Sequence, residues 1–151
     1  PPASRKQLET VERYVELARE EGAQLACGGY RLDGPGYDSG YYFAPTILTG
    51  VSNSMRVARE EIFGPVLAVM TFRTADEAIE KANNLAYGLS AGVWTDKGAK
   101  IFAMTKRLKA GVVWANTFNK FDPTSPFGGY KESGFGREGG IHGLEAYVDL
   151  G

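Results

Sequence analysis

The sequence predicts an α/β fold, with a parallel-sheet core and flanking helices. From about residue 66 the chain alternates short apolar runs with stretches of helical periodicity. The apolar runs 66–70 and 112–115 are continuous, which is typical of strands covered on both faces. The resulting order, strand–helix–strand–helix–strand, favours one parallel sheet with right-handed crossovers. In such sheets ligands bind beyond the carboxyl ends of the strands.

The first part of the chain predicts one long helix and several short segments. Ser4 and Gln7 have the spacing of a capping box, and apolar residues follow at helical intervals until Gly22. Pro45 interrupts an extended segment, which favours a sheet edge for it. The short segments are a strand at 23–27, a loop at 28–40, an extended stretch at 42–49 and a short helix at 54–59.

The second part predicts two more helices between apolar strands. Thr74 and Glu77 form a second capping box, and Gly88 is expected to end that helix. Asp96 is expected to cap the next helix and Gly111 to terminate it. The expected strands are 66–70, 89–94 and 112–115, and a long loop follows at 116–136. Loops of that length in compact domains are often functional.

Composition bounds the possible functions. The 151 residues suggest about one domain, and 17 basic against 18 acidic residues leave a net charge of -1. That balance argues against a nucleic-acid partner, and no apolar stretch suggests a membrane partner. Cys27 is the only cysteine, which fits a reducing compartment, so we expect a cytoplasmic protein. The start at Pro1 and the strand-like end at Leu150 predict a piece of a longer protein.

Three candidate sites are rejected on context. Gly134–Gly139 matches G-x-G-x-x-G, but no predicted strand leads into it, so it is interpreted as a flexible loop. Cys27 follows a short strand without a nearby base, so we expect a small buried side chain rather than a nucleophile. His142 has no neighbouring metal-ligand type and is expected to be structural or on the surface.

The segment Glu60–Val66 is the strongest candidate for binding. It places an acidic pair, Phe63 and a rigid Gly-Pro turn directly before an apolar strand. A carboxylate accepts hydroxyl hydrogens, and a phenyl ring offers a flat apolar face. A solvated helix end is the alternative for the acidic pair. Phe121 and Phe127, in the long loop, fit either core packing or an apolar substrate entrance.

Four motifs, in order, resemble the aldehyde dehydrogenase superfamily, and together they span nearly the whole chain. They are Gly40–Thr46 (GYYFAPT), Glu60–Val66 (EEIFGPV), Asn83–Leu89 (NNLAYGL) and Ser125–Gly134 (SPFGGYKESG) with the following Gly136–Glu138 (GRE). The resemblance implies the C-terminal part of that family's catalytic domain. It implies an NAD(P)-dependent enzyme in which a cysteine attacks the aldehyde, hydride passes to nicotinamide and a thioester is hydrolysed.

The resemblance also implies site residues. Glu61 is similar to the residue that binds the ribose hydroxyls on the nicotinamide side, and Phe63 to one that packs near the nicotinamide ring. Asn116, Phe121 and Phe127 are similar to residues near the aldehyde tunnel.

Three further assignments belong to one subgroup of the family. In members that oxidise betaine aldehyde, the equivalents of Lys131 and Gly134 help to hold potassium through carbonyl oxygens. Glu138 is similar to a proton-relay glutamate in the same subgroup.

The family pattern is incomplete in this chain. The Gly-Gln-x-Cys segment with the nucleophile, the general-base glutamate and the Gly-rich cofactor region are missing, and Cys27 does not take the nucleophile's place. Residues 1–151 are therefore interpreted as a partial catalytic domain, inactive alone, whose parent forms a homodimer or homotetramer. Two alternatives remain: a stand-alone, non-catalytic module that docks on full-length relatives, and an unrelated nucleotide-binding domain.

Overall fold

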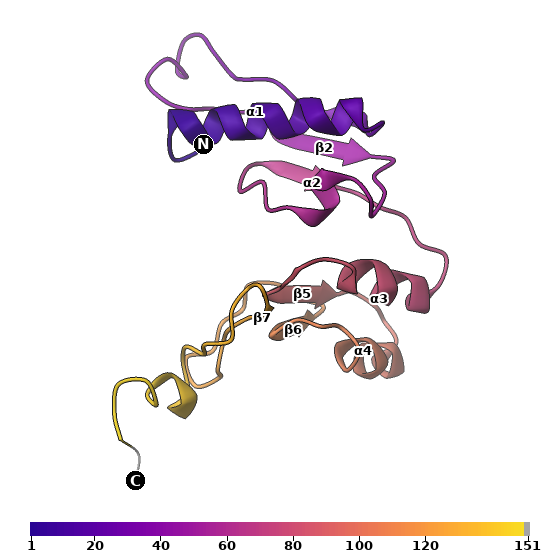
Figure 1. The fold of residues 1–151 in the computed structure, drawn as a ribbon, viewed down its shortest axis with the longest axis vertical. Helices are drawn as coiled ribbons and strands as arrows, with labels where there is room; N and C mark the ends of the chain where they lie inside the picture. Colours follow the sequence, from indigo (N-terminus) through magenta and orange to yellow (C-terminus); the bar gives the residue numbers. More distant parts are fainter. Residues whose placement is uncertain (150–151) are drawn as a thin grey trace. The chain divides into compact units, whose positions relative to one another are not determined.

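The computed structural model describes residues 1–149, and the chain divides into two compact units. One unit spans Pro1–Phe72, and the other begins at Arg73. Each unit contains paired strands and at least one helix of its own (Figure 1). The α/β class predicted from the sequence is confirmed, because both units contain a pair of parallel strands and helices beside them.

The first unit is a three-stranded sheet with two helices. The strand order is β1-β2-β3, with β1 antiparallel to β2 and β2 parallel to β3. The strands are β1 (Gln24–Cys27), β2 (Thr46–Thr49) and β3 (Val66–Ala68), and the helices are α1 (Arg5–Glu20) and α2 (Arg56–Arg59). Pro45 immediately precedes β2, so the missing N–H of proline does not interrupt the hydrogen bonds between this central strand and its neighbours. The prediction of an edge position for that segment is therefore wrong.

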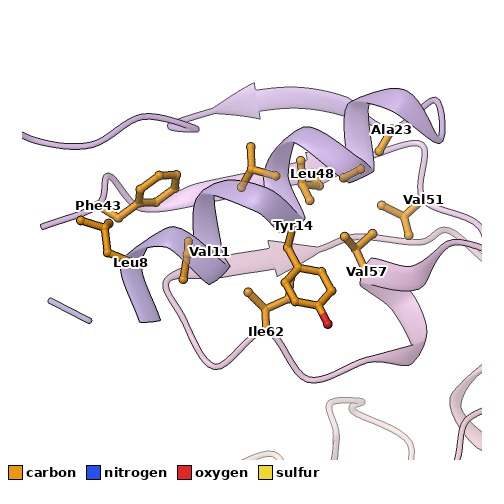
Figure 2. Packing of buried hydrophobic residues seen from close by; sticks show 11 residues of the cluster. Leu8, Val11, Tyr14, Ala23, Phe43, Leu48, Val51, Val57 and Ile62 are labelled. Atoms are coloured by element: carbon orange, nitrogen blue, oxygen red, sulfur yellow. The ribbon is translucent and has the colours of Figure 1, made fainter. Parts of the chain in front are cut away.

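Helix α1 supplies most of the core of this unit. Its apolar residues recur at helical spacing, and Leu8, Val11 and Ala18 are at most 1% exposed. They pack with Leu48 of β2, which is 0% exposed, and with Ile62 from the segment before β3 (Figure 2). The periodicity that predicted the helix therefore also predicted its buried face.

The second unit contains two small sheets. The parallel pair β5-β6 joins Ser90–Val93 to Val112–Ala115, and the antiparallel pair β4-β7 joins Tyr87–Gly88 to Tyr130–Lys131. The helical segments are α3 (Ala75–Asn83), α4 (Gly98–Thr105) and the short 3₁₀ helix η1 (Ile141–Gly143). Gly111 allows close contact before β6, since a Cβ there would lie 1.7 Å from the carbonyl oxygen of Gly128.

The three strands expected in one parallel sheet lie in two sheets. β3 pairs with β2, whereas β5 pairs with β6. Leu67 at the centre of β3 is 58% exposed, so the expectation that both faces of this strand are covered is also wrong. A continuous apolar run indicates that a strand is suited to burial, but it does not identify its hydrogen-bonding neighbour.

The helix ends were predicted with mixed success. Ser4 and Thr74 cap α1 and α3 through their hydroxyls, and Gly22 follows α1 with φ of 98°, as expected. Asp96 does not cap α4, because Lys97 holds that position without a side-chain bond. Gly88 does not end α3: the helix ends at Asn83, and Gly88 lies in β4.

The packing of α1 on β2 generates a stability prediction. Leu48→Ala removes a fully buried side chain and is expected to lower the free energy of unfolding by about 2–5 kcal/mol. Urea denaturation followed by far-UV circular dichroism measures the change, since both tryptophans, Trp94 and Trp114, lie in the second unit. Leu67→Ala, at a 58% exposed position, is the control, and a comparable loss there would contradict the assignment of the core.

Candidate functional site

The two adjacent glutamates before β3 have different surroundings. Glu60 accepts hydrogen bonds from the Tyr14 hydroxyl at 2.6 Å and from the Arg56 guanidinium at 2.7 and 2.8 Å. The bonds from Arg56, then from Tyr14, lower the pKa of Glu60 to about 2. The same contact with Glu60, followed by burial, raises the pKa of Tyr14. Glu60 therefore links α1 to α2, and its carboxylate has a structural role.

Glu61 is the carboxylate that remains available. Its side chain is exposed, and within residues 1–149 it accepts no hydrogen bond and forms no ion pair. Extended backbone turns successive side chains to opposite sides, and Glu60 has φ of -115° and ψ of 149°. The interaction of Glu60 with α1 and α2 therefore leaves its neighbour facing away from the protein.

Phe63 is presented to solvent by a strained backbone. Its ring is 77% exposed, whereas the neighbouring Ile62 is 8% exposed and belongs to the core. The φ of Phe63 is 55°, in the left-handed region, which costs a bulky residue on the order of 1–3 kcal/mol. Such strain persists only where surrounding contacts enforce it, and two contacts with α1 do so here.

Both contacts come from the first turns of α1. The Gln7 amide donates to the carbonyl oxygens of Ile62 at 2.8 Å and of Phe63 at 2.9 Å. Gly64 lies against Val11, and a Cβ at this glycine would be 2.4 Å from a methyl group of that valine. The predicted capping box at Ser4 is half formed: Ser4 Oγ accepts from the Gln7 N–H, but the Gln7 side chain reaches across to this segment.

An apolar hollow of about 430 Å³ lies beside Phe63. Its walls include Gln7 and residues from the start of the chain, from the approach to β2 and from the turn before β3. They are Pro1, Pro2, Ala3, Gln7, Phe43, Pro45, Phe63, Gly64 and Pro65. A second hollow of about 420 Å³ is more polar and is lined by Arg31, Asp33 and neighbouring loop residues. Only the first adjoins a predicted site residue.

The predicted substrate residues lie in the second unit. Asn116, with φ of 53°, follows β6, and its amide exchanges two hydrogen bonds with the backbone of Thr95 at 2.9 and 3.0 Å. This amide therefore ties the carboxyl ends of β5 and β6 together. The local role of Asn116 is structural, and its place near a substrate stays a prediction.

Phe121 and Phe127 contact each other edge to face, with ring centroids 5.0 Å apart. Phe121 is 59% exposed and also packs on Trp114 at 5.5 Å, and Trp114 contacts Phe118 at 4.9 Å. Phe118 was not singled out in the sequence, although it lies two residues after Asn116 in the same predicted loop, 116–136. The rings form an aromatic surface next to the end of β6, in which Phe118 and Phe121 are exposed, Phe127 is half-buried and Trp114 is buried.

The residues predicted to hold potassium make other contacts here. The Lys131 ammonium donates to the carbonyl oxygens of Asn83 and Leu85, both at 2.9 Å, and so satisfies the end of α3. The Lys131 carbonyl accepts from the Gly134 N–H at 3.2 Å. Glu138 is exposed, and its backbone pairs with that of Phe127 at 2.7 Å. Among residues 1–149 no group of three His, Cys, Asp or Glu side chains is placed to bind a metal.

Two of the three rejected candidates, His142 and Cys27, give one confirmed prediction and one error. His142 lies exposed in η1, as expected. Cys27 is exposed rather than buried, because β1 is an edge strand with an irregular register between Leu25 and Cys27. The Cys27 thiol contacts the Pro45 carbonyl oxygen at 3.8 Å. In the part of the chain that the structure describes, no helix is long and apolar enough to cross a membrane.

Comparison with known proteins decides the family. Residues 1–150 match the sequence profile described as "Aldehyde dehydrogenase family". The chain belongs to this family. It is 44% identical over 150 residues to the "Putative aldehyde dehydrogenase DhaS" of Bacillus subtilis and 47% identical to an aldehyde dehydrogenase of Enchytraeus buchholzi. The matches cover 99% of this chain but 30% and 29% of those aldehyde dehydrogenases, so the chain spans about a third of their length.

Solved aldehyde dehydrogenase structures share the fold. A betaine aldehyde dehydrogenase from Staphylococcus aureus, in complex with NAD+, superimposes with a TM-score of 0.94 at 42% identity. The match covers 97% of this chain and 30% of that one. The indole-3-acetaldehyde dehydrogenase AldA of P. syringae, in complex with NAD+ and IAA, gives 0.91 at 44% identity, covering 97% and 29%.

The interaction between Glu60, Tyr14 and Arg56 predicts a pH-dependent stability. The folded pKa of Glu60, about 2, lies below its ordinary value of 4.5, so its stabilising effect is complete above about pH 4.5 and is lost as the pH falls toward 2. Glu60→Gln is expected to lower the melting temperature at pH 7, and the difference from wild type is expected to shrink over that interval. Thermal unfolding at several pH values measures it. Glu61→Gln is the matched control, and an equal loss there would contradict this assignment.

Proposed function

We propose that this chain is part of the catalytic domain of an NAD-dependent aldehyde dehydrogenase that oxidises an aldehyde to the carboxylic acid. The observation that carries the proposal is the exposed pair Glu61 and Phe63, which α1 and α2 hold without using either side chain. Family membership and the NAD+ complexes of the similar enzymes support it.

The residues present fit the nicotinamide half of NAD. A carboxylate without a protein partner accepts hydrogen bonds from two neighbouring ribose hydroxyls, and Glu61 has that freedom. The exposed face of Phe63 suits an apolar ring, and the adjoining hollow is largely apolar. NAD supplies the hydride acceptor when bound. The role proposed for this chain is to bind and orient NAD.

The aromatic surface of the second unit is proposed as one wall of the substrate entrance. Phe121 and Phe127 support one another and present apolar ring surface. Asn116 fixes the loop that carries Phe121 by holding Thr95. The similar enzymes act on betaine aldehyde and on indole-3-acetaldehyde, at 42% and 44% identity, so the likeness selects no single aldehyde.

Several finer assignments extend the same proposal. NADP is the alternative cofactor. A potassium ion is proposed to bind the carbonyl oxygens of Lys131 and Gly134, and Glu138 is proposed to act as a proton relay. The aldehyde dehydrogenase is proposed to be cytoplasmic and to form a homodimer or homotetramer. The exposure of Glu138 supports access to water, which a relay requires.

Loss of the free carboxylate tests the cofactor assignment. In the enzyme that contains this chain, Glu61→Gln removes charge-assisted hydrogen bonds worth about 1.5–3 kcal/mol, so NAD affinity is expected to fall about 10- to 100-fold. Calorimetric titration with NAD measures the dissociation constant. Glu60→Gln, at the adjacent position, is expected to retain the affinity while losing stability. Unchanged NAD affinity in Glu61→Gln would refute the assignment.

The 151 residues alone are expected to produce no NADH from aldehydes. Their one cysteine, Cys27, lies on an edge strand, where its thiol is 3.8 Å from the Pro45 carbonyl oxygen, and among residues 1–149 no basic side chain accepts a hydrogen bond from it. The assay is absorbance at 340 nm with the purified polypeptide, NAD and an aldehyde. Activity that disappears in Cys27→Ala would show that this cysteine is a nucleophile after all.

A further inference from the structure

We propose that Gln7 is a positioning residue for the cofactor site: it orients Glu61 and Phe63 by holding the backbone at Ile62 and Phe63. The inference rests on the proposed function, because it assigns Gln7 a role toward the same cofactor. Gln7 is 55 residues away from Ile62 in sequence, and it carries no catalytic group. The effect proposed for it passes through the two carbonyl oxygens that it binds.

The geometry uses both hydrogens of the Gln7 amide. One goes to the Ile62 carbonyl at 2.8 Å and the other to the Phe63 carbonyl at 2.9 Å. Two bonds from one planar group to successive carbonyls fix the direction of the peptide plane between them. That plane sets φ of Phe63, which is 55°, and hence the direction of the ring.

The donor itself is held rigidly. Gln7 lies in the first turn of α1, where its own N–H donates to Ser4 Oγ at 3.2 Å. The next residue, Leu8, is 1% exposed, and Val11 one turn later is 0% exposed and contacts Gly64. The segment is therefore clamped by a polar contact at Ile62 and Phe63 and by a packing contact at Gly64.

The burial pattern shows what this clamp accomplishes. Ile62 points into the core at 8% exposure, while Phe63 is 77% exposed and Glu61 is also exposed. An exposed Phe ring ordinarily gains by folding back onto apolar surface, and such surface lies beside it in the hollow that Gln7 and Phe63 both line. Anchoring both carbonyls opposes that collapse and keeps the ring and the carboxylate accessible.

The test compares two glutamines in the enzyme that contains this chain. Gln7→Met keeps the length of the side chain and removes both donors, and Gln24→Met, at an exposed position on β1, is the matched control. In Gln7→Met, but not in Gln24→Met, we expect the NAD affinity measured by calorimetry to fall about tenfold. We also expect the rate of hydride transfer, normalised to titrated active sites, to fall about tenfold. Normalisation separates misplacement from a loss of folded protein.

Hydrogen exchange gives a readout that does not depend on activity. In Gln7→Met the peptide covering residues 60–66 is expected to exchange about tenfold faster than in wild type, while α1 and β2 keep their protection. Equal NAD affinity, hydride-transfer rate and exchange in Gln7→Met and Gln24→Met would overturn the proposal. A wild-type enzyme that makes no NADH from any aldehyde would instead refute the proposed function, while the exchange comparison still reports on the clamp.

A second variant keeps the proposal testable if Gln7→Met does not fold. Gln7→Glu places a carboxyl group against two carbonyl oxygens, and it can donate a hydrogen bond to one of them only when it is protonated. Its hydride-transfer rate relative to wild type is expected to fall as the pH rises through the ionisation of the introduced group. A ratio that is independent of pH would overturn the positioning role.

Discussion

The packing of α1 on β2 and on the segment before β3 is the contact on which the first unit depends. Val11 is fully buried and lies so close to Gly64 that no side chain fits at that glycine. Because the helix is amphipathic over its whole length, its apolar face packs against both the sheet and the segment before β3. The proposed cofactor residues inherit their positions from this helix.

The two adjacent glutamates before β3 have different partners. Glu60 and Glu61 are chemically identical neighbours, yet Glu60 is bound by Tyr14 and Arg56 while Glu61 has no partner in residues 1–149. The first carboxylate stabilises the approach to β3, and the second is the one that we propose binds the cofactor. In this proposal, stability and cofactor binding depend on two different carboxylates, although the two residues are adjacent in the chain.

Local patterns in the sequence predicted most of the secondary structure. Ser4 and Thr74 cap their helices because an N-cap hydroxyl needs only a backbone N–H three residues away. The same logic failed for the side chain of Gln7, which bonds to carbonyl oxygens 55 and 56 residues away, and for Cys27, whose exposure depends on β1 being an edge strand. Spacing predicts contacts within one turn, but competition between near and distant partners is decided by the assembled fold.

By itself the sequence determined the α/β class, the helical face of α1 and the motifs that assign the chain to the aldehyde dehydrogenase family, because each depends on residues close together in the chain. Only the tertiary structure decided which glutamate is free, why Phe63 faces outward and which strands pair. Those features arise from contacts between residues far apart in sequence, whose geometry no local pattern encodes.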